Sequence, residues 1–208
     1  MAESTQHAPD TSGLEVAIVG AGNGGLAVAG YVGLGGARVR LFDIVADRIE
    51  PIATRGGIDV TGAVSGFAPV AVATTDPEHA VAGADIVVLV VAGPDQAAAA
   101  RALTECMPQS SYLLVKPGCT GGALEVHDVL TQGGRSDVTV GETDSFLFAC
   151  SEPGPAASHI AAIKRTVGVA ALPPGRSTEL LATVQTLFPQ AGVLPSVLHC
   201  GFSNMNCR

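Results

Sequence analysis

A glycine cluster near the N-terminus and an acid about twenty residues later have the spacing of a dinucleotide-binding site. The cluster consists of Gly20, Ala21, Gly22, Asn23, Gly24 and Gly25, and the acid is Asp43. Gly20 allows a tight turn, Gly22 lets a pyrophosphate approach the backbone, and Gly25 lets a helix pack closely on the sheet. Free amide groups and the positive end of the helix dipole attract phosphate at such a turn. The pattern therefore predicts that this turn binds a pyrophosphate.

The carboxylate of Asp43 indicates which dinucleotide is preferred. It can accept hydrogen bonds from both hydroxyls of the adenosine ribose, and it would repel a 2′-phosphate. We therefore predict NAD as the cofactor, with NADP less favoured. Arg48 is the nearest downstream cation, and it weakens this preference somewhat.

The elements that position these residues are readable from hydrophobic patterns. The apolar run 16–19 predicts a buried strand, residues 26–34 have helical periodicity, and the apolar run 39–42 predicts a second strand that ends at Asp43. Strand, glycine turn, helix, strand and acid follow in the order that a dinucleotide site requires. The alternative is a glycine-rich turn that is only structural.

The rest of the chain continues this alternation. Six buried apolar runs alternate with helical segments, and a predicted hairpin over 57–61 and 67–73 interrupts them. This predicts an α/β protein with a Rossmann-type, doubly wound parallel sheet. In such sheets the ligand lies at the carboxyl ends of the strands.

Further candidates for cofactor binding follow the other predicted strands. They are Val91, Ala92, Gly93, Pro117, Thr120 and Glu142. Each segment has an alternative reading. Gly93 and Pro94 are equally consistent with a simple turn, Lys116 with a solvated strand end, and Glu142 with a partner for a loop or a helix dipole.

Composition excludes several other classes of protein. The formal net charge of -8 and the absence of a basic cluster argue against nucleic-acid binding. The longest apolar run, 86–92, is too short to span a membrane. Residues 1–13 are polar and predict a disordered tail, not a signal peptide, so we expect a cytoplasmic protein. The five cysteines include no CxxC pair and are expected to be reduced.

The pattern changes after Glu142. We expect strands over 146–150, 160–169 and 193–198, and a helix over 177–188. We assign 14–190 to the dinucleotide-binding domain and 191–208 to the start of a linker or second domain, truncated at the C-terminus. The apolar segment 193–205 is expected to be an exposed docking face through which the chain self-associates.

Chemistry beyond cofactor binding has little support in the chain. Of the five histidines, His199 is the nearest to the expected hinge with a second domain, where a catalytic proton donor would lie. We expect no metal, because no cluster of His, Cys or carboxylates has the spacing of metal ligands.

Together, these residues resemble the N-terminal, NAD-binding part of the opine (octopine/nopaline) dehydrogenase family. The similarity runs from Val16 to the C-terminus. It rests on the glycine cluster, on Pro117-Gly118 followed by Thr120-Gly121-Gly122-Ala123-Leu124-Glu125, and on Gly141-Glu142-Thr143, with shorter matches downstream. Lys116 and Cys119 depart from the commoner Asn and Arg of that loop.

This resemblance implies a two-domain NAD(P)-dependent enzyme whose second, helical domain is missing here. Such enzymes condense an amino acid with a 2-oxo acid, so these are the implied small-molecule partners. It also implies that the family's catalytic histidine would lie beyond Arg208, so no catalytic residue is assigned and the chain alone is expected to be inactive. One alternative is a non-catalytic NAD-sensing module. Another is an enzyme like glycerol-3-phosphate dehydrogenase or ketopantoate reductase, against which the TGGALE and GET segments argue.

Overall fold

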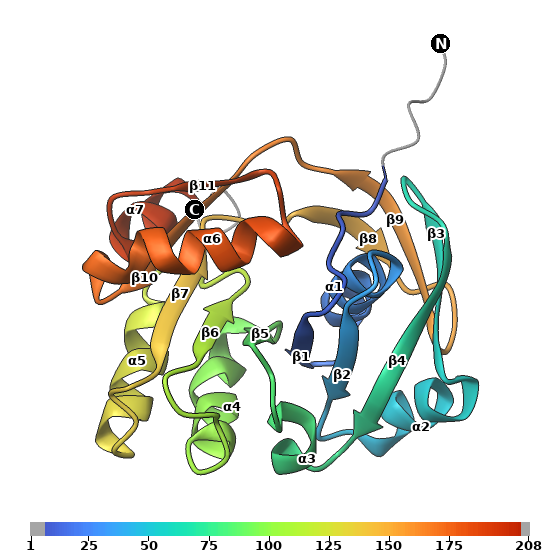
Figure 1. Ribbon diagram of the computed structural model, residues 1–208, viewed down its shortest axis with the longest axis horizontal. Helices are drawn as coiled ribbons and strands as arrows, with labels where there is room; N and C mark the ends of the chain where they lie inside the picture. Colours follow the sequence, from blue (N-terminus) through green and yellow to red (C-terminus); the bar gives the residue numbers. More distant parts are fainter. Residues whose placement is uncertain (1–6, 205–208) are drawn as a thin grey trace.

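The computed structural model describes residues 7–204 and shows one mixed sheet with helices on both faces (Figure 1). The strands are β1 (Glu15–Val19), β2 (Arg38–Phe42), β3 (Gly57–Gly62), β4 (Gly66–Thr74), β5 (Ile86–Leu89), β6 (Tyr112–Val115), β7 (Thr139–Thr143), β8 (Phe148–Ser151), β9 (Ala157–Ile163), β10 (Val167–Leu172) and β11 (Ala191–Val193). The helices are α1 (Asn23–Leu34), α2 (Ala46–Arg55), α3 (Pro77–Val81), α4 (Gln96–Leu103), α5 (Gly122–Gln132), α6 (Ser177–Leu187) and α7 (Val197–Ser203), with 3-10 turns η1 (Gly93–Asp95) and η2 (Pro174–Arg176).

The centre of the sheet confirms the predicted doubly wound arrangement. Six parallel strands lie in the order β4-β2-β1-β5-β6-β7. The chain moves outward from β1 in one direction and then returns to β5 on its other side, so the order reverses between β1 and β5. In open α/β sheets ligands bind beside this reversal, outside the carboxyl ends of the strands.

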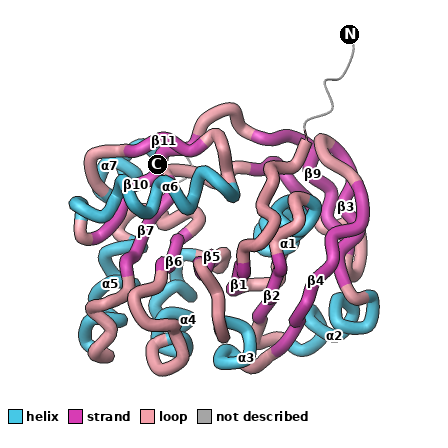
Figure 2. Tube along the Cα trace, in the orientation of Figure 1, coloured by secondary structure: helices cyan, strands magenta, loops and turns pink. Residues whose placement is uncertain are grey.

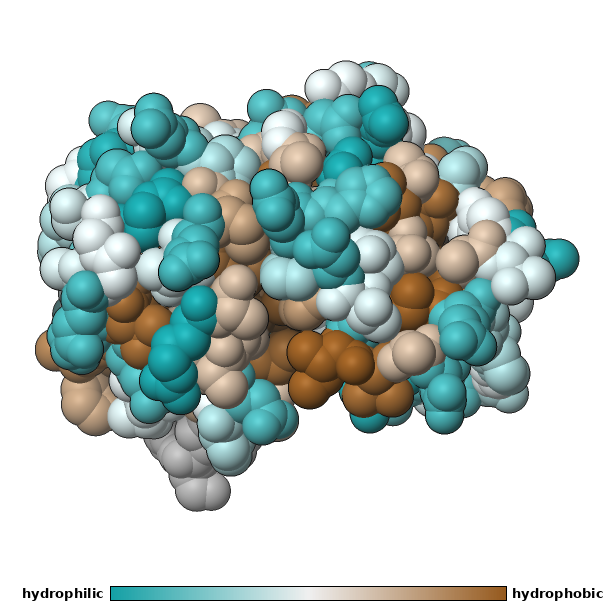
Figure 3. Space-filling view, turned by 90° about the horizontal axis from the view of Figure 1, so that it is seen from below, coloured by the Kyte–Doolittle hydropathy of each residue, from teal (hydrophilic) through white to brown (hydrophobic). Residues whose placement is uncertain are grey.

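Alternate residues of β1 pack into two separate apolar cores, one on each face of the sheet. Val16 and Ile18 belong to the core beneath α1 and α6, and Ala17 and Val19 to the core beneath α3, α4, α5 and α7. This burial on both faces explains why the strand is an uninterrupted apolar run. Some apolar side chains also reach the surface, where Figure 3 shows them in small groups between hydrophilic residues.

The outer strands make the sheet mixed, whereas the sequence patterns predict a parallel sheet interrupted by one hairpin. On one side β10 pairs antiparallel with β7, and β11 pairs parallel with β10. On the other side the predicted hairpin, β3 and β4, is confirmed, and it extends through β9 to β8. Figure 2 shows these strands continuing around α1. The predicted strand over 160–169 is two strands, because the chain turns at 164–166 between β9 and β10.

Helix α1 is enclosed by the sheet and its extension, and every residue from Gly25 to Gly33 is buried. Its glycines allow this close packing. A Cβ atom at Gly30 would lie 2.6 Å from a methyl carbon of Val60 on β3. Tyr31 stacks against Phe188 and packs against Phe148, with ring centroids 6.4 and 5.0 Å apart respectively. Glycines within the helix, such as Gly30, therefore serve packing. The glycines in the turn before the helix are a separate case.

The predicted disordered tail over 1–13 is wrong for its second half. Thr11 is buried, its hydroxyl donates to the carbonyl of Val32 at 2.7 Å, and its amide donates to the carbonyl of Gly35 at 2.9 Å. The hydroxyl also accepts from the amide of Ala37 at 3.0 Å. Thr11 thus satisfies backbone groups at the C-terminal end of α1, which a polar composition does not reveal. Residues 1–6 lie outside the described part of the chain.

The last described segment also corrects a prediction. In place of a strand over 193–198, β11 ends at Val193 and α7 begins at Val197. Pro195 cannot donate to a strand ladder, which favours a break there. Val197 and Cys200 of α7 are buried in the core. Residues 191–204 therefore belong to the same domain, and the boundary predicted at residue 190 is wrong within the described chain. Residues 205–208 lie outside it.

Helix α2 continues through Pro51, although proline usually interrupts a helix. The helix ends instead after Arg55, where Gly56 adopts the left-handed conformation with φ of 74° and donates its amide to the carbonyl of Ile52. A proline inside a helix costs one backbone hydrogen bond, and the packing of Ile49 and Ile52 in the core offsets that cost.

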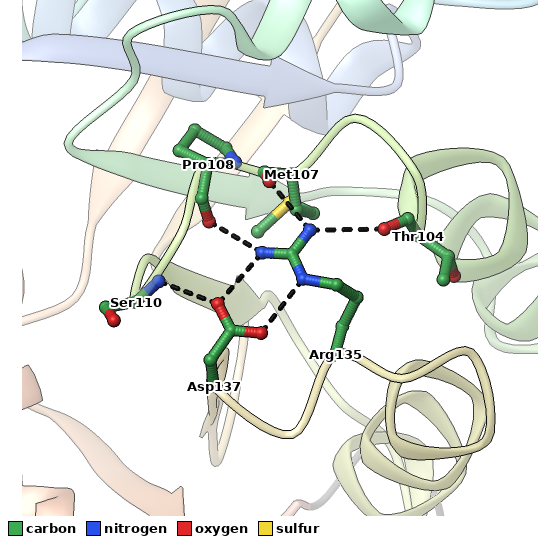
Figure 4. Close-up of polar contacts among 6 residues, drawn as sticks. All are labelled: Thr104, Met107, Pro108, Ser110, Arg135 and Asp137. Atoms are coloured by element: carbon green, nitrogen blue, oxygen red, sulfur yellow. Dashed lines mark hydrogen bonds and ion pairs between the residues drawn. The ribbon is translucent and has the colours of Figure 1, made fainter.

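Arg135 fastens the connection between α4 and β6 (Figure 4). Its guanidinium donates to the carbonyls of Thr104, Met107 and Pro108, at 2.7–3.2 Å. It also forms a two-pronged ion pair with Asp137, whose other partner is the amide of Ser110. These charged hydrogen bonds hold the pKa of Asp137 well below its ordinary value. The clamp fixes a loop that would otherwise leave several carbonyls unpaired.

Candidate functional site

The turn from β1 into α1 can close only with glycine at two positions. Gly20 has a positive φ of 107°, and a Cβ atom there would overlap the carbonyl oxygen of Val90. A Cβ atom at Gly25 would overlap the carbonyl oxygen of Gly20. The two glycines therefore bring the turn against the end of β5 and the helix against the turn, as their spacing predicts.

Gly22 differs from these two glycines, because the space in front of it is open. No atom lies within 4 Å of where its Cβ atom would be. Gly22 is the N-cap of α1, and no side chain caps the helix there. The amide groups of the first helical turn have no partner within the helix. An anionic group can therefore approach these amides without meeting a side chain, which fits the pyrophosphate of a dinucleotide.

Asp43 lies beside this turn and is held by it. Its carboxylate accepts from the amide of Ala21 at 2.7 Å and from the amide of Val45 at 2.9 Å. Arg48 pairs with it at 3.3 Å, although more than half of the arginine side chain is exposed. The side chain of Asp43 is itself only 6% exposed. Its position at the end of β2 is therefore fixed by the turn, with acceptor capacity left for a ligand.

A cavity of about 500 Å³ joins the turn to Asp43 and to α4. Its lining consists of Val19, Gly20, Gly22, Asn23, Gly24, Phe42, Asp43, Ile44, Val45, Arg48, Val90, Val91, Ala92, Asp95, Ala98, Ala99 and Ala102. The structure thus brings together seven of the predicted site residues: Gly20, Gly22, Asn23, Gly24, Asp43, Val91 and Ala92. The volume of this cavity is within the usual range for small-molecule sites.

Sequence reasoning missed the wall of the cavity that α4 forms. Ala98, Ala99 and Ala102 present small apolar side chains to it, and Ile44 and Val45 also line it. Such a lining suits a flat aromatic ring system. The signal in the sequence is the alanine-rich run itself, because it gives a helix surface with little side-chain bulk.

The remaining predicted residues do not line the cavity. Ala21 and Gly25 support the turn from behind, and Gly93 begins η1. Pro117 and Thr120 lie in the loop between β6 and α5. The carbonyl of Pro117 accepts from the side chain of Gln96 at 3.0 Å, and the hydroxyl of Thr120 donates to the carbonyl of Gly201 on α7 at 3.5 Å. That loop is therefore tied to α4 and α7.

Glu142 fastens the same loop from the end of β7. One carboxyl oxygen accepts from the amide of Ala123, at the start of α5, at 3.0 Å. The other has no partner, and the side chain is 1% exposed. Burial raises the pKa of Glu142 to about 7, against the opposing effect of the Ala123 amide. A Cβ atom at Gly118 would overlap this carboxyl group, so the glycine makes room for it.

Lys116 is fully buried, so the interpretation of a solvated strand end is wrong. Its ammonium nitrogen lies 3.9 Å from the ring centroid of Phe188 and 5.9 Å from that of Phe146. Among the described residues 7–204, no hydrogen-bond partner reaches this nitrogen. Burial lowers the pKa of Lys116 to about 7, while the nearby carboxylate of Asp144 acts to raise it and Lys164 to lower it.

Other candidate groups lie apart from the cavity. His199, on α7, has its Nδ1 3.0 Å from the hydroxyl of Ser196 at an exposed position. Val193, Leu198 and Phe202 are more than half exposed on the segment expected to self-associate, which stays a prediction. Within residues 7–204 no group of His, Cys, Asp and Glu is arranged to hold a metal ion, and no helix is long and apolar enough to cross a membrane.

Comparisons with known proteins agree with this geometry. The family model of the NAD-dependent glycerol-3-phosphate dehydrogenase N-terminus matches residues 15–125. The opine dehydrogenase of Arthrobacter sp. (strain 1C) is 36% identical over 191 residues, which are 91% of this chain and 53% of that protein. The chain therefore spans about half the length of this relative.

Solved structures share the fold at lower identity. An octopine dehydrogenase structure with NADH and L-arginine has a TM-score of 0.80 and 20% identity, covering 92% of this chain and 51% of that one. A yersinopine dehydrogenase with NADP+ has a TM-score of 0.71 and 19% identity, covering 90% and 49%. A ketopantoate reductase from Ralstonia eutropha has a TM-score of 0.67 and 22% identity, covering 87% and 56%.

The range that the family model matches, residues 15–125, includes the glycine turn and the acid at the end of β2. The resemblance drawn from the glycine cluster and the downstream motifs is confirmed. The chain belongs to the family of NAD-dependent glycerol-3-phosphate dehydrogenase N-terminal domains, and it is similar over most of its length to about half of the opine dehydrogenase of Arthrobacter.

Proposed function

We propose that this chain is the cofactor-binding part of an oxidoreductase of the opine dehydrogenase type. Such an enzyme joins an amino acid to a 2-oxo acid and reduces the product with NADH. The observation that carries the proposal is the cavity between the open glycine turn and Asp43, in a chain 36% identical to an opine dehydrogenase.

The residues of the cavity have separable roles in binding. The first-turn amides of α1, in front of Gly22, would hold the pyrophosphate. Asp43 would accept from the ribose hydroxyls, and the alanines of α4 with Ile44 would enclose the adenine. When bound, the dihydronicotinamide supplies the hydride that reduces the condensed substrates.

We further propose that NADH is preferred over NADPH. The buried carboxylate of Asp43 would lie against the 2′-phosphate of NADPH, and the repulsion of like charges in a largely buried site is costly. Arg48 reduces this repulsion in part, since it pairs with the same carboxylate from an exposed position. The preference is therefore expected to be moderate.

Catalysis also needs a proton donor beside the substrate. Among residues 7–204, no histidine lines the cavity, and Asp43 and Asp95 are its acidic residues. We therefore propose that the 208-residue chain binds NADH but does not turn over, because proton transfer and substrate positioning require further groups.

A chimera tests this function. The chain would be joined to the C-terminal half of the Arthrobacter opine dehydrogenase, the part of that relative beyond the matched region. We expect the chain alone to bind NADH without turnover. The chimera should oxidise NADH in the presence of pyruvate and an amino acid, and should form a secondary amine dicarboxylate that mass spectrometry identifies. Ordinary turnover by the chain alone, or a folded, NADH-binding chimera that forms no such product, would contradict the proposal.

A second candidate is a dehydrogenase that reduces a carbonyl group directly. The matched family model and the ketopantoate reductase structures favour it. The same assay distinguishes the two functions, because dihydroxyacetone phosphate or ketopantoate would then be reduced without any amino acid. A chain that binds NADH but supports neither reaction in the chimera would instead favour an NAD-sensing module.

A further inference from the structure

The cavity contains little positive charge with which to hold a pyrophosphate. Among its described lining residues Arg48 is the one cation, and it already pairs with Asp43. Asp43 and Asp95 add negative charge to the same lining. The dipole of α1 supplies about half a positive charge at its N-terminus, whereas a pyrophosphate carries about two negative ones. Another source of positive charge near the turn would therefore strengthen binding.

Lys116 and the glycine turn both lie close to one aromatic ring, that of Phe146. The lysine nitrogen is 5.9 Å from the centroid of this ring. The tip of the same ring would be 3.1 Å from a Cβ atom at Gly24, a residue that lines the cavity. The ring is partly buried against the core, so little water screens a charge on Lys116 from the turn.

The surroundings of Lys116 leave its protonation state open to outside influence. Phe188 stabilises the charged form through its ring face, and Asp144 favours it as well. Burial and the like charge of Lys164 favour the neutral form. Within residues 7–204, Asp144 and Lys164 are the charged groups that act on it appreciably. These influences nearly balance at neutral pH, so a dianion placed near the turn can determine whether Lys116 is protonated.

We propose that dinucleotide binding draws a proton onto Lys116, so that its buried ammonium group stabilises the bound pyrophosphate at the glycine turn. This inference rests on the proposed cofactor site and adds a positioning residue to it. Lys116 does not touch the cofactor and acts through the field that it sets at the turn. Binding and proton uptake are then linked, and NADH binds more tightly at lower pH.

The experiment measures NADH affinity of the 208-residue protein by nicotinamide fluorescence between about pH 6 and pH 9, and proton uptake by calorimetry in two buffers of different ionisation enthalpy. If binding raises the pKa of the lysine by about one unit, the dissociation constant rises about tenfold across this range. ADP-ribose, which carries the pyrophosphate without nicotinamide, should show the same rise, and adenosine should not.

Two variants assign the proton. Lys116→Met retains the length of the side chain without its charge, and should bind more weakly at pH 6.5 with no pH dependence and no proton uptake. Lys164→Met is the matched control. It removes a neighbouring like charge, so it should move the pH profile upward without abolishing it. The Lys164 result and the wild-type proton uptake remain decisive if Lys116→Met does not fold.

Several outcomes would overturn the proposal. One is NADH affinity in the wild type that does not change with pH. Another is full proton uptake in folded Lys116→Met. A third is loss of the uptake in Glu142→Gln, with normal uptake in Lys116→Met, since the proton would then belong to Glu142. Failure of the wild type to bind NADH, NADPH or ADP-ribose at any pH would instead overturn the cofactor site, and this proposal with it.

Discussion

Gly22 precedes helix α1 and Gly25 lies in its first turn, and we predict that alanine at each has a different effect. An added methyl group at Gly22 meets no atom within 4 Å, and the φ of -81° suits an L-residue. The main cost to stability is a poorer N-cap, about 0.5–1 kcal/mol. In a domain of this size that lowers Tm by about 2–4 °C. Gly22→Ala should therefore fold normally.

The same methyl group should strongly weaken cofactor binding. It would stand in the cavity in front of the first-turn amides of α1, where the pyrophosphate is expected to lie. Losing one charge-assisted hydrogen bond costs about 1.5–3 kcal/mol, and each 1.4 kcal/mol is a factor of ten in affinity. The dissociation constant of Gly22→Ala for NADH should therefore rise at least about tenfold.

Gly25→Ala should instead damage the fold. Its methyl group would overlap the backbone carbonyl of Gly20, which cannot rotate away as a side chain can. Overpacking of this kind costs about 1–3 kcal/mol or more. The assay is thermal unfolding followed by circular dichroism, with NADH fluorescence titration of the same samples. A folded Gly22→Ala that binds NADH as tightly as the wild type would refute our placement of the pyrophosphate, and an unchanged Tm for Gly25→Ala would refute the packing argument.

Three further predictions concern the fold. Unfolding free energy should fall from pH 4.5 to 7, because native Glu142 retains a proton that the unfolded chain loses, and rise from 7 to about 9, because native Lys116 lacks one that the unfolded chain holds. Above about pH 9 the raised pKa of the Cys200 thiol acts in the opposite direction. Urea titrations should therefore show a minimum in unfolding free energy near pH 7. The fall below pH 7 should be smaller in Glu142→Gln, and the rise above pH 7 should be smaller in Lys116→Met. Arg135→Ala leaves three carbonyls without their hydrogen-bond donor. It should lower Tm by about 5–10 °C without changing NADH affinity. Gly30→Ala should destabilise α1, and Val60→Ala, which removes the methyl carbon 2.6 Å away, should recover part of the loss in the double variant; strictly additive effects would contradict this contact.

The first βαβ unit was predictable because local pattern and tertiary role agree there. The apolar run of β1, the glycine turn and Asp43 each predict the same structure, a βαβ unit that binds a dinucleotide. The parallel centre of the sheet follows from the same alternation of strands and helices. Those features carry part of the candidate site, so the glycine turn, Asp43 and the end of β5 were predictable as lining of the cavity.

The wrong predictions concern residues whose local structure depends on contacts with residues far away in the sequence. Thr11 is ordered by backbone groups at the end of α1, and α7 is fixed by the core beneath Val197. The burial of Lys116 depends on Phe188, which is 72 positions later and packs over it. Composition and periodicity describe a residue's neighbours in sequence, and these three cases depend on neighbours in space.

The most direct test of the cofactor site is a parallel titration of the 208-residue protein with NADH and NADPH, in the wild type and in Asp43→Asn. We predict saturable binding of both nucleotides, with NADH tighter in the wild type. Removing the charge of Asp43 should improve NADPH binding relative to NADH, because the 2′-phosphate no longer faces a carboxylate. Tighter binding of NADPH by the wild type, or a folded wild type that binds neither nucleotide, would contradict the site.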